Sequence, residues 1–271
     1  MLNERQTKIL EFIARNGEVK NTEIKALCPD YSDMTIWRDL EKIESEGHIR
    51  RIWGGAAYAG KTPKQREHNF NFRMKQSTAA KEEISKIASA VIRTGHSYFF
   101  DAGSTIYTMT GFLPDERYTI ITSAANVAVE LAHRANCSVT LLGGQLDPVT
   151  LSCSGTQSLD MLEDLNVEIA IMATSGYSAY SGFTCGSINE SQLKKRVINK
   201  SRLTVMLLDH DKVGTNLPYT FSTLGNIDIL ITDSRSQELL KDAESHNVTV
   251  FYPGDGLSPA ERASLCEKKL H

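Results

Sequence analysis

The sequence has few cysteines, and their spacing does not pair them. There are five, an odd number, and no two are spaced C-x-x-C. A disulfide framework or a structural zinc site is therefore not predicted, and a reducing compartment fits. No apolar run approaches the ~18 residues that a membrane span needs, and the early charges Glu4 and Arg5 are atypical of a signal peptide. We expect a cytoplasmic protein with no membrane segment.

Several motifs of metal and cofactor chemistry are also absent. None of the seven histidines stands in an H-E-x-x-H pattern, and no serine lies in G-x-S-x-G. The G-x-G-x-x-G fingerprint of dinucleotide-binding folds is missing as well. These absences give no support to a metalloenzyme or a serine hydrolase and weaken a dinucleotide interpretation. We expect neither a metal ion nor a cofactor.

The chain as a whole has no excess of positive charge, but one segment does. The formal net charge is −3, whereas residues 48–75 hold seven basic side chains and one acid, Glu67. A local excess of this kind can face phosphate while the rest of the chain keeps the protein soluble. Composition alone is equally compatible with a solvated linker.

The start of the chain predicts three short helices. Asn3 and Ser32 are candidate N-caps for the first and the third, and Pro29 closes off the second. In the third helix Ile36, Leu40 and Ile43 are spaced i, i+4, i+7, and at about 100° per residue they share one face. The expected helices cover about residues 4–16, 21–28 and 33–46.

The opposite face of the third helix displays side chains that suit DNA. A hydroxyl, an Arg and a Lys on the last of three short helices are typical of a helix-turn-helix with a recognition helix. Three-helix units also serve as packing modules, and surface cations on helices often only face solvent. The residues that we expect to contact DNA from this helix are Met34, Thr35, Trp37, Arg38 and Lys42.

A hairpin is predicted directly after the third helix. Two short β-capable runs within residues 48–58 flank a Gly-Gly turn. A hairpin at this place is the wing of a winged helix-turn-helix, and Arg50 and Arg51 are placed in it to contact backbone phosphate. The predicted DNA-binding domain is therefore residues 1–58, followed by a basic linker, residues 59–76.

From residue 77 on, predicted strands and helices alternate, which indicates an α/β domain with a mostly parallel sheet covered on both faces. Polar residues follow the strands and would meet at one sheet edge, where ligands of open α/β sheets bind. The turn Gly103-Ser104-Thr105 adds hydroxyls and N–H groups suited to an anion. Taken singly, each such residue could be only a cap or solvated surface. The residues after the strands are Asp101, Thr122, Gly143, Ser175, Asp209 and Asp233.

Together these motifs resemble those of the DeoR family of bacterial transcriptional regulators, over nearly the whole chain. In the first domain the resemblance rests on Glu4-Arg5, Thr35-Ile36, Arg38-Asp39-Leu40 and Gly54-Gly55-Ala56. In the second it rests on the run from Asp101 to Thr105, Gly182-Phe183-Thr184, Glu190 with Lys194, and Asp209 with Lys212.

The resemblance implies a winged helix-turn-helix joined to a Rossmann-like sensor domain similar to ribose-5-phosphate isomerase, here residues 77–271. It implies a repressor of a carbohydrate operon that binds double-stranded operator DNA and is controlled by a phosphorylated sugar or a related metabolite. We expect a homodimer or a homotetramer. The expected effector-binding residues are Asp101, Gly103, Ser104, Thr105, Thr122, Asn126, Gly143, Gly144, Ser175, Gly176, Glu190, Lys194, Asp209 and Lys212.

The sequence departs from the family pattern in both domains. The recognition helix usually reads T-I-R-R-D-L, and here Trp37 replaces one arginine, while Trp53 stands where the wing usually has His. Ser175 occupies a position that is often Asp, which weakens an enzymatic interpretation because isomerases of this fold use acidic residues in that loop. The alternative that stays open is a sugar-phosphate isomerase or deaminase with Glu190 as the base. An isomerase has no need of residues 1–58, and this favours the regulator.

Overall fold

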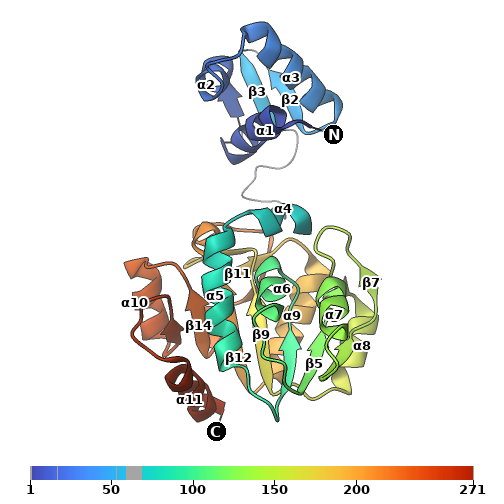
Figure 1. Ribbon diagram of the computed structural model, residues 1–271, viewed down its shortest axis with the longest axis vertical. Helices are drawn as coiled ribbons and strands as arrows, with labels where there is room; N and C mark the ends of the chain where they lie inside the picture. Colours follow the sequence, from blue (N-terminus) through green and yellow to red (C-terminus); the bar gives the residue numbers. More distant parts are fainter. Residues whose placement is uncertain (1, 17, 53, 59–68, 271) are drawn as a thin grey trace. The chain divides into compact units, whose positions relative to one another are not determined.

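The computed structural model describes residues 2–16, 18–52, 54–58 and 69–270 (Figure 1). The chain divides into two compact units, Met1–Arg66 and Glu67–His271. Each unit has buried apolar clusters of its own. The two units are therefore described one at a time.

The first unit contains the three expected helices around one small core. Asn3 Oδ1 accepts a hydrogen bond from the Gln6 N–H at 2.9 Å, which confirms the first N-cap. Ser32 Oγ accepts one from the Thr35 N–H at 3.2 Å, which confirms the cap of the third helix. The helices are α1 (Glu4–Asn16), α2 (Asn21–Leu27) and α3 (Asp33–Ser45).

The predicted hairpin is confirmed, and a third strand lies beside it. β2 (Ile49–Ile52) and β3 (Gly55–Tyr58) are antiparallel, and β1 (Glu18–Lys20) pairs with the other edge of β3. Position 55 requires glycine, because an added Cβ at Gly55 would lie 2.0 Å from the carbonyl oxygen of Val19. β1 was not predicted, since three residues are too few to show a period.

The second unit is built on seven parallel strands in the order β15-β14-β12-β9-β4-β5-β6. The predicted parallel sheet is thereby confirmed. From β4 the chain runs outward through β5 and β6, and it then returns to the other side of β4 with β9. Open α/β sheets bind ligands beside the carboxyl ends of the strands at such a reversal. The strands are β4 (Ser97–Phe100), β5 (Tyr118–Thr122), β6 (Cys137–Leu141), β9 (Ile169–Ala173), β12 (Leu203–Leu208), β14 (Ile229–Thr232) and β15 (Thr249–Phe251).

Helices cover both faces of this sheet, and successive side chains of each strand divide between the faces. On β4, Tyr98 and Phe100 pack with α5, α6, α7 and α11, whereas Phe99 packs with α8, α9 and α10. Figure 1 shows α5, α6 and α7 on the near side of the sheet. The helices are α5 (Thr78–Val91), α6 (Ser104–Thr110), α7 (Ala125–Ala132), α8 (Thr156–Glu163), α9 (Ile188–Lys200), α10 (Gln237–Ser245) and α11 (Pro259–Leu270).

Part of the expected linker is a helix. α4 (Phe70–Lys75) lies within the residues that the sequence assigned to the linker, and the Phe70 ring packs edge-on against Tyr107 of α6 with centroids 5.4 Å apart. The Phe70 N–H also donates to the carbonyl oxygen of Val149 at 2.8 Å. α4 therefore belongs structurally to the second unit, while residues 59–68 of the expected linker lie outside the described residues.

Smaller elements complete the second unit, and the sequence did not predict them. α8 and two short antiparallel sheets fall in segments too brief to show a period, and α11 is a longer helix that the sequence analysis did not assign. Among the residues that the structure describes, no helix is long and apolar enough to cross a membrane. The short strands are β7 (Gln145–Leu146), β8 (Cys153–Ser154), β10 (Gly176–Ser178), β11 (Gly182–Cys185) and β13 (Tyr219–Ser222).

Candidate functional site

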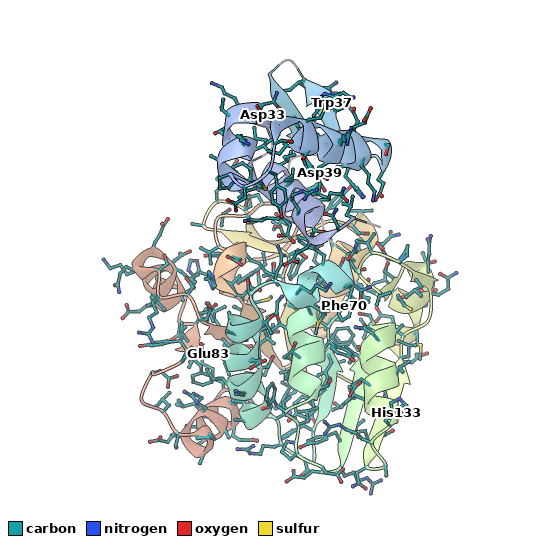
Figure 2. All side chains as sticks on the ribbon, turned by 45° about the horizontal axis from the view of Figure 1, so that its top comes forward. Asp33, Trp37, Asp39, Phe70, Glu83 and His133 are labelled. Carbon is teal, nitrogen blue, oxygen red and sulfur yellow. The ribbon has the colours of Figure 1, made fainter. Side chains whose placement is uncertain are left out.

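Helix α3 has a buried side and an exposed side, as the spacing of its apolar residues predicted. Ile36, Leu40 and Ile43 are buried in the core of the first unit. Figure 2 shows Trp37 and Asp39 on opposite sides of the helix. Of the residues expected to contact DNA from α3, Thr35 is half-buried. The other four are exposed: Met34, Trp37, Arg38 and Lys42.

Buried Asp39 fixes α3 against α1. Arg5 Nε lies 2.5 Å from Asp39 Oδ2, and Gln6 Nε2 donates to Asp39 Oδ1 at 2.8 Å. The hydrogen bond to Asp39 raises the pKa of the Arg5 guanidinium, which also lies 4.2 Å from the centre of the Tyr31 ring. No structural role was expected for Arg5 and Asp39 from the sequence. The sequence held a signal for this role, because Asp39 is an acid on the core side of a predicted helix, and a buried carboxylate needs a partner.

The two wing arginines have different surroundings. Arg50 is exposed on β2. Arg51 donates through Nε to Glu44 Oε2 at 2.6 Å and through its N–H to Glu44 Oε1 at 2.7 Å, and these bonds lower the pKa of Glu44. The Arg51 guanidinium also lies 4.9 Å from the centre of the Trp37 ring. Arg51, expected to contact phosphate, is thus held by Glu44 and Trp37. Trp53 lies outside the described residues.

In the second unit a buried ion pair lies at the reversal of strand order. Asp101 directly follows β4, and its carboxylate pairs with Lys194 of α9. Lys194 Nζ also donates to the Ala173 carbonyl at 2.9 Å and lies 3.3 Å from Glu190 Oε1. Burial by itself lowers the pKa of Lys194, but the charges of Asp101 and Glu190 outweigh this and raise it. The structure therefore brings together three residues that the sequence predicted as a site.

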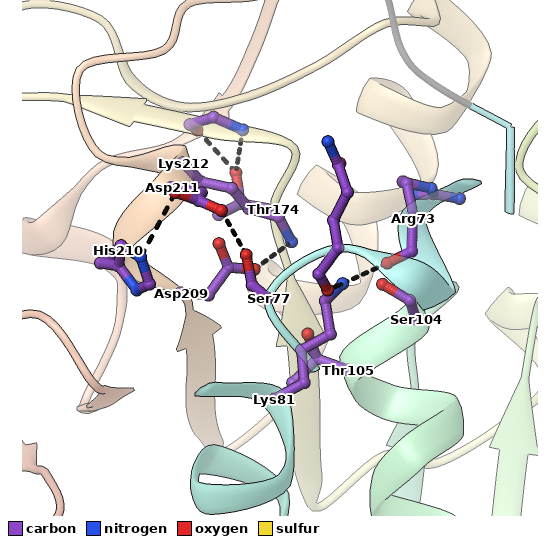
Figure 3. A network of polar contacts seen from close by, with 12 residues as sticks. Arg73, Ser77, Lys81, Ser104, Thr105, Thr174, Asp209, His210, Asp211 and Lys212 are labelled. Atoms are coloured by element: carbon purple, nitrogen blue, oxygen red, sulfur yellow. Dashed lines mark hydrogen bonds and ion pairs between the residues drawn. The ribbon is translucent and has the colours of Figure 1, made fainter. Parts of the chain in front are cut away.

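A second charged cluster follows β12 (Figure 3). Lys212 Nζ lies 3.1 Å from the buried carboxylate of Asp209. Lys81, buried in the first turn of α5, donates to the carbonyl oxygens of Arg73 and Gln76, the latter at 2.5 Å. Burial lowers the pKa of Lys81 to about 8, and the positive charge of Lys212 contributes to this.

Sequence reasoning missed Lys81, although a signal was present. The helix that precedes a strand of a parallel sheet runs antiparallel to that strand. The first turn of α5 therefore lies at the carboxyl edge of the sheet, beside the residues that follow the strands. A lysine in that turn is therefore a candidate for the ligand site. It was missed because its local sequence is typical of an ordinary solvated helix start.

Hydroxyl groups lie beside these cations. Ser104 and Thr105 are buried at the start of α6, and Figure 3 shows them next to Lys81. Within the described residues, Ser104 Oγ has no hydrogen-bond partner. Buried hydroxyls are nearly always bonded to protein, water or ligand. A buried hydroxyl beside a buried ammonium group has the donor chemistry that an anion requires.

Other expected effector residues have structural contacts. Thr122 Oγ1 accepts a hydrogen bond from the Ala124 N–H at 3.0 Å, within its own turn. A Cβ at Gly144 would lie 2.7 Å from the Ser154 carbonyl oxygen, and one at Gly176 would lie 2.4 Å from that of Thr215. These glycines allow backbone segments to pack closely. The contacts described for these three residues thus support loops and do not join the two charged clusters.

Most of the remaining expected effector residues also have contacts within the protein. Gly103 lies against the sheet, since a Cβ there would be 3.0 Å from Ala173 Cβ. The carbonyl oxygen of Gly143 accepts a hydrogen bond from Ser158. The Ser175 N–H donates to the Thr184 carbonyl at 3.1 Å. Among the described residues, the amide nitrogen of Asn126 is buried without a hydrogen-bond partner.

Comparisons with known proteins match both units. A family profile described as the DeoR-like helix-turn-helix domain matches residues 5–62, and one described as the DeoR C terminal sensor domain matches residues 76–234. The HTH-type transcriptional regulator GolR of Listeria innocua serovar 6a is 31% identical over 88% of this chain and 92% of its own length. The HTH-type transcriptional repressor GlcR of Bacillus subtilis (strain 168) is 28% identical over 90% of this chain and 93% of its own length.

Among solved structures, ribose 5 phosphate isomerase A from Neisseria gonorrhoeae matches 49% of this chain and 54% of that chain, with 14% identity and a TM-score of 0.35. A likeness this weak supports no conclusion, and the fold is established by the strand order and the family profiles. The sensor-domain profile alone matches more than half of the chain. The chain therefore belongs to the DeoR family of transcriptional regulators, with an N-terminal helix-turn-helix domain and a C-terminal sensor domain.

Proposed function

We propose that this regulator represses transcription by binding operator DNA through α3 and the wing, and that a phosphorylated sugar bound in the second unit controls this binding. In this proposal Thr35, Arg38 and Lys42 contact bases in the major groove, and Arg50 contacts phosphate. The repressor role draws support from GlcR, a relative that is named a transcriptional repressor.

The observation that carries the ligand proposal is the group of polar atoms at the carboxyl edge of the sheet. Lys81 and Lys212 provide ammonium groups, and the Ser104 hydroxyl, which has no hydrogen-bond partner among the described residues, lies beside Lys81. Ammonium and hydroxyl donors bind phosphate through charge-assisted hydrogen bonds. The buried position of Lys81 strengthens such a bond, because little water competes for it.

The carboxylates of the same edge favour a sugar phosphate over free phosphate. Asp101, Glu190 and Asp209 are all buried there. An ionised carboxylate only accepts hydrogen bonds, so it repels phosphate but binds the hydroxyl groups of a sugar. A ligand with a phosphate at one end and hydroxyls at the other satisfies both sets.

Binding without turnover is part of the proposal. A base for enolisation must reach the carbon acid of the substrate. Glu190 Oε1 lies 3.3 Å from Lys194 Nζ, so the expected base is held in an ion pair. We expect no ketose to form when the protein is incubated with ribose 5-phosphate. Measurable isomerisation would favour the enzyme instead.

A thermal-shift screen across sugar phosphates tests the ligand proposal. A ligand at a hundred times its Kd stabilises the folded state by about 2.7 kcal/mol. We expect at least one sugar phosphate to raise the unfolding temperature, and the parent sugar and inorganic phosphate to raise it less. If no sugar phosphate stabilises the protein, the ligand part of the proposal is wrong.

The proposed assembly is a homodimer or a homotetramer formed through the second unit. Two recognition helices set at a fixed distance bind two half-sites, and a ligand controls DNA binding only if it prefers one arrangement of them. Light scattering on the full chain, with and without operator DNA, measures the assembly. A monomer in both conditions would contradict this part of the proposal.

A further inference from the structure

Two large apolar side chains are exposed on α3, the helix proposed to enter the major groove. Met34 is 61% exposed and Trp37 is 48% exposed. Three residues apart, they are neighbours on the helix surface. Both lie in the first half of α3, which is the part of a recognition helix that reaches base edges. Single exposed apolar residues are common, but a pair on a binding face indicates an apolar partner.

The Trp37 ring is held in place before DNA arrives. The Arg51 guanidinium lies 4.9 Å from the ring centre, and Arg51 is itself fixed by two hydrogen bonds to Glu44, of 2.6 and 2.7 Å. Guanidinium groups stack on indole faces, which leaves the other face and the edge of the ring for a partner. Arg51 is therefore a positioning residue for Trp37, and Glu44 positions Arg51.

The major groove offers one apolar group, the C5-methyl of thymine. An arginine at position 37 would pair with the acceptors of guanine, whereas an indole ring offers mainly apolar surface. We propose that Met34 and Trp37 form an apolar reading surface that recognises thymine methyl groups in the operator. This inference rests on the proposed DNA-binding function and adds the chemical feature that is read.

The test removes the methyl groups and leaves the base pairing intact. Full-length protein first selects duplexes from a pool with a random central segment. The best duplex is then remade with deoxyuridine at each thymidine in turn, and its affinity is measured by fluorescence anisotropy. We expect one or two positions at which the loss of a methyl weakens binding about fourfold each. Deoxyuridine in the constant segments that flank the selected central segment is the matched control and should have no effect.

Substitutions in the protein separate methyl recognition from other effects of the deoxyuridine exchange. Trp37→Ala should distinguish thymidine from deoxyuridine duplexes less than the wild type does, with only the contribution of Met34 left, and Trp37→Arg should select duplexes richer in guanine at the affected positions. Circular dichroism checks that both variants fold, and Met34→Ala serves if either does not. Equal binding of both duplexes by the wild type would overturn the inference, as would an undiminished methyl effect in Trp37→Ala.

The selection step also distinguishes a failure of the proposed DNA-binding function from a failure of the proposed methyl recognition. Enrichment of a duplex that proves insensitive to methyl loss leaves the DNA-binding function standing and overturns only the reading surface. Failure to enrich any duplex contradicts the proposed function, and the reading surface falls with it.

Discussion

Lys81 and Gln76 connect the candidate ligand site to helix α4. Lys81 Nζ donates to the Gln76 carbonyl oxygen at 2.5 Å and also bonds to the carbonyl of Arg73 at the end of α4. Ser77, in the left-handed conformation with φ 47°, bonds to the carboxylate of Asp211. The turn after α4 is thus held in part by Lys81, which is also proposed to bind the ligand, and by Asp211, which lies two residues after Asp209.

Ligand affinity should depend on the charge of Lys81. The pKa of this lysine is lowered to about 8, first by burial, so its ammonium form is lost as pH rises through that value. A sugar phosphate is already dianionic above pH ~7, since its second pKa is about 6. We expect calorimetric affinity for the sugar phosphate to fall from pH 7 to pH 9 by up to about tenfold, because a group with this pKa loses most of its protonated form over that range. In Lys81→Met the affinity should be weak at both pH values, and a pH dependence like that of the wild type would contradict the assigned role.

The Asp39 carboxylate should stabilise the first unit. Asp39→Asn removes the charge that faces Arg5 and leaves a buried amide in its place, at an expected cost of about 2 kcal/mol. Both tryptophans of the chain, Trp37 and Trp53, belong to the first unit, so their fluorescence reports its unfolding in the full-length protein. The matched control is Asp33→Asn, which changes an exposed carboxylate of the same helix and should cost well under ~1 kcal/mol. Equal effects of the two substitutions would show that the buried pair contributes no more to the stability of the first unit than an exposed carboxylate does.

Breaking the buried ion pair of the second unit should be more costly than removing both partners. Lys194→Met leaves the Asp101 charge without its cation, and breaking such pairs typically costs about 3–5 kcal/mol. Adding Asp101→Asn to this variant should recover part of the loss. Urea unfolding followed by far-ultraviolet circular dichroism gives the values. Arg196→Met, on the same helix as Lys194 and in an exposed pair with Glu163, is the control and should have a much smaller effect, because exposed ion pairs contribute little to stability. Additive effects at Lys194 and Asp101 would count against a coupled pair.

His210 should contribute stability that depends on pH. Its hydrogen bond to Asp233, with Nδ1 and Oδ2 2.5 Å apart, raises the pKa of the imidazole above 6.5. Because the folded state holds the proton more tightly, the contribution is complete below the unfolded pKa and is lost as pH rises through the folded pKa. The difference in unfolding temperature between wild type and His210→Gln should therefore be largest at pH 5–6 and small at pH 9. A difference that grows with pH would refute this account.

The elements with a regular pattern were predictable from the sequence. Ile36, Leu40 and Ile43 recur at the helical period and identify the buried side of α3. The central strand β9 is a continuous apolar run and β12 is interrupted only by Thr204, as is typical of strands covered on both faces. Asp101 and Asp209 each follow a strand, which was visible in the sequence. Because the carboxyl ends of parallel strands lie at one edge of the sheet, their proximity to that edge was predictable.

Contacts between distant segments were not predictable in this way. The sequence indicated Trp37 and Arg51 only as DNA contacts, and it is the packing of the wing on α3 that brings them together with Glu44. The helix α4 lay inside a stretch that looked like a charged linker, and it is stabilised by the contact of Phe70 with Tyr107. Such pairings follow from tertiary packing, which a local pattern does not contain.

An anionic sugar derivative bound in the second unit is proposed to control DNA binding by the first. Fluorescence anisotropy of the selected duplex, titrated with sugar phosphates and with their parent sugars at pH 7, measures this coupling. We expect at least one sugar phosphate to change operator affinity tenfold or more, about 1.4 kcal/mol, and Arg38→Ala to bind that ligand without retaining the duplex. Tight operator binding that no sugar phosphate alters would show that the ligand does not control DNA binding.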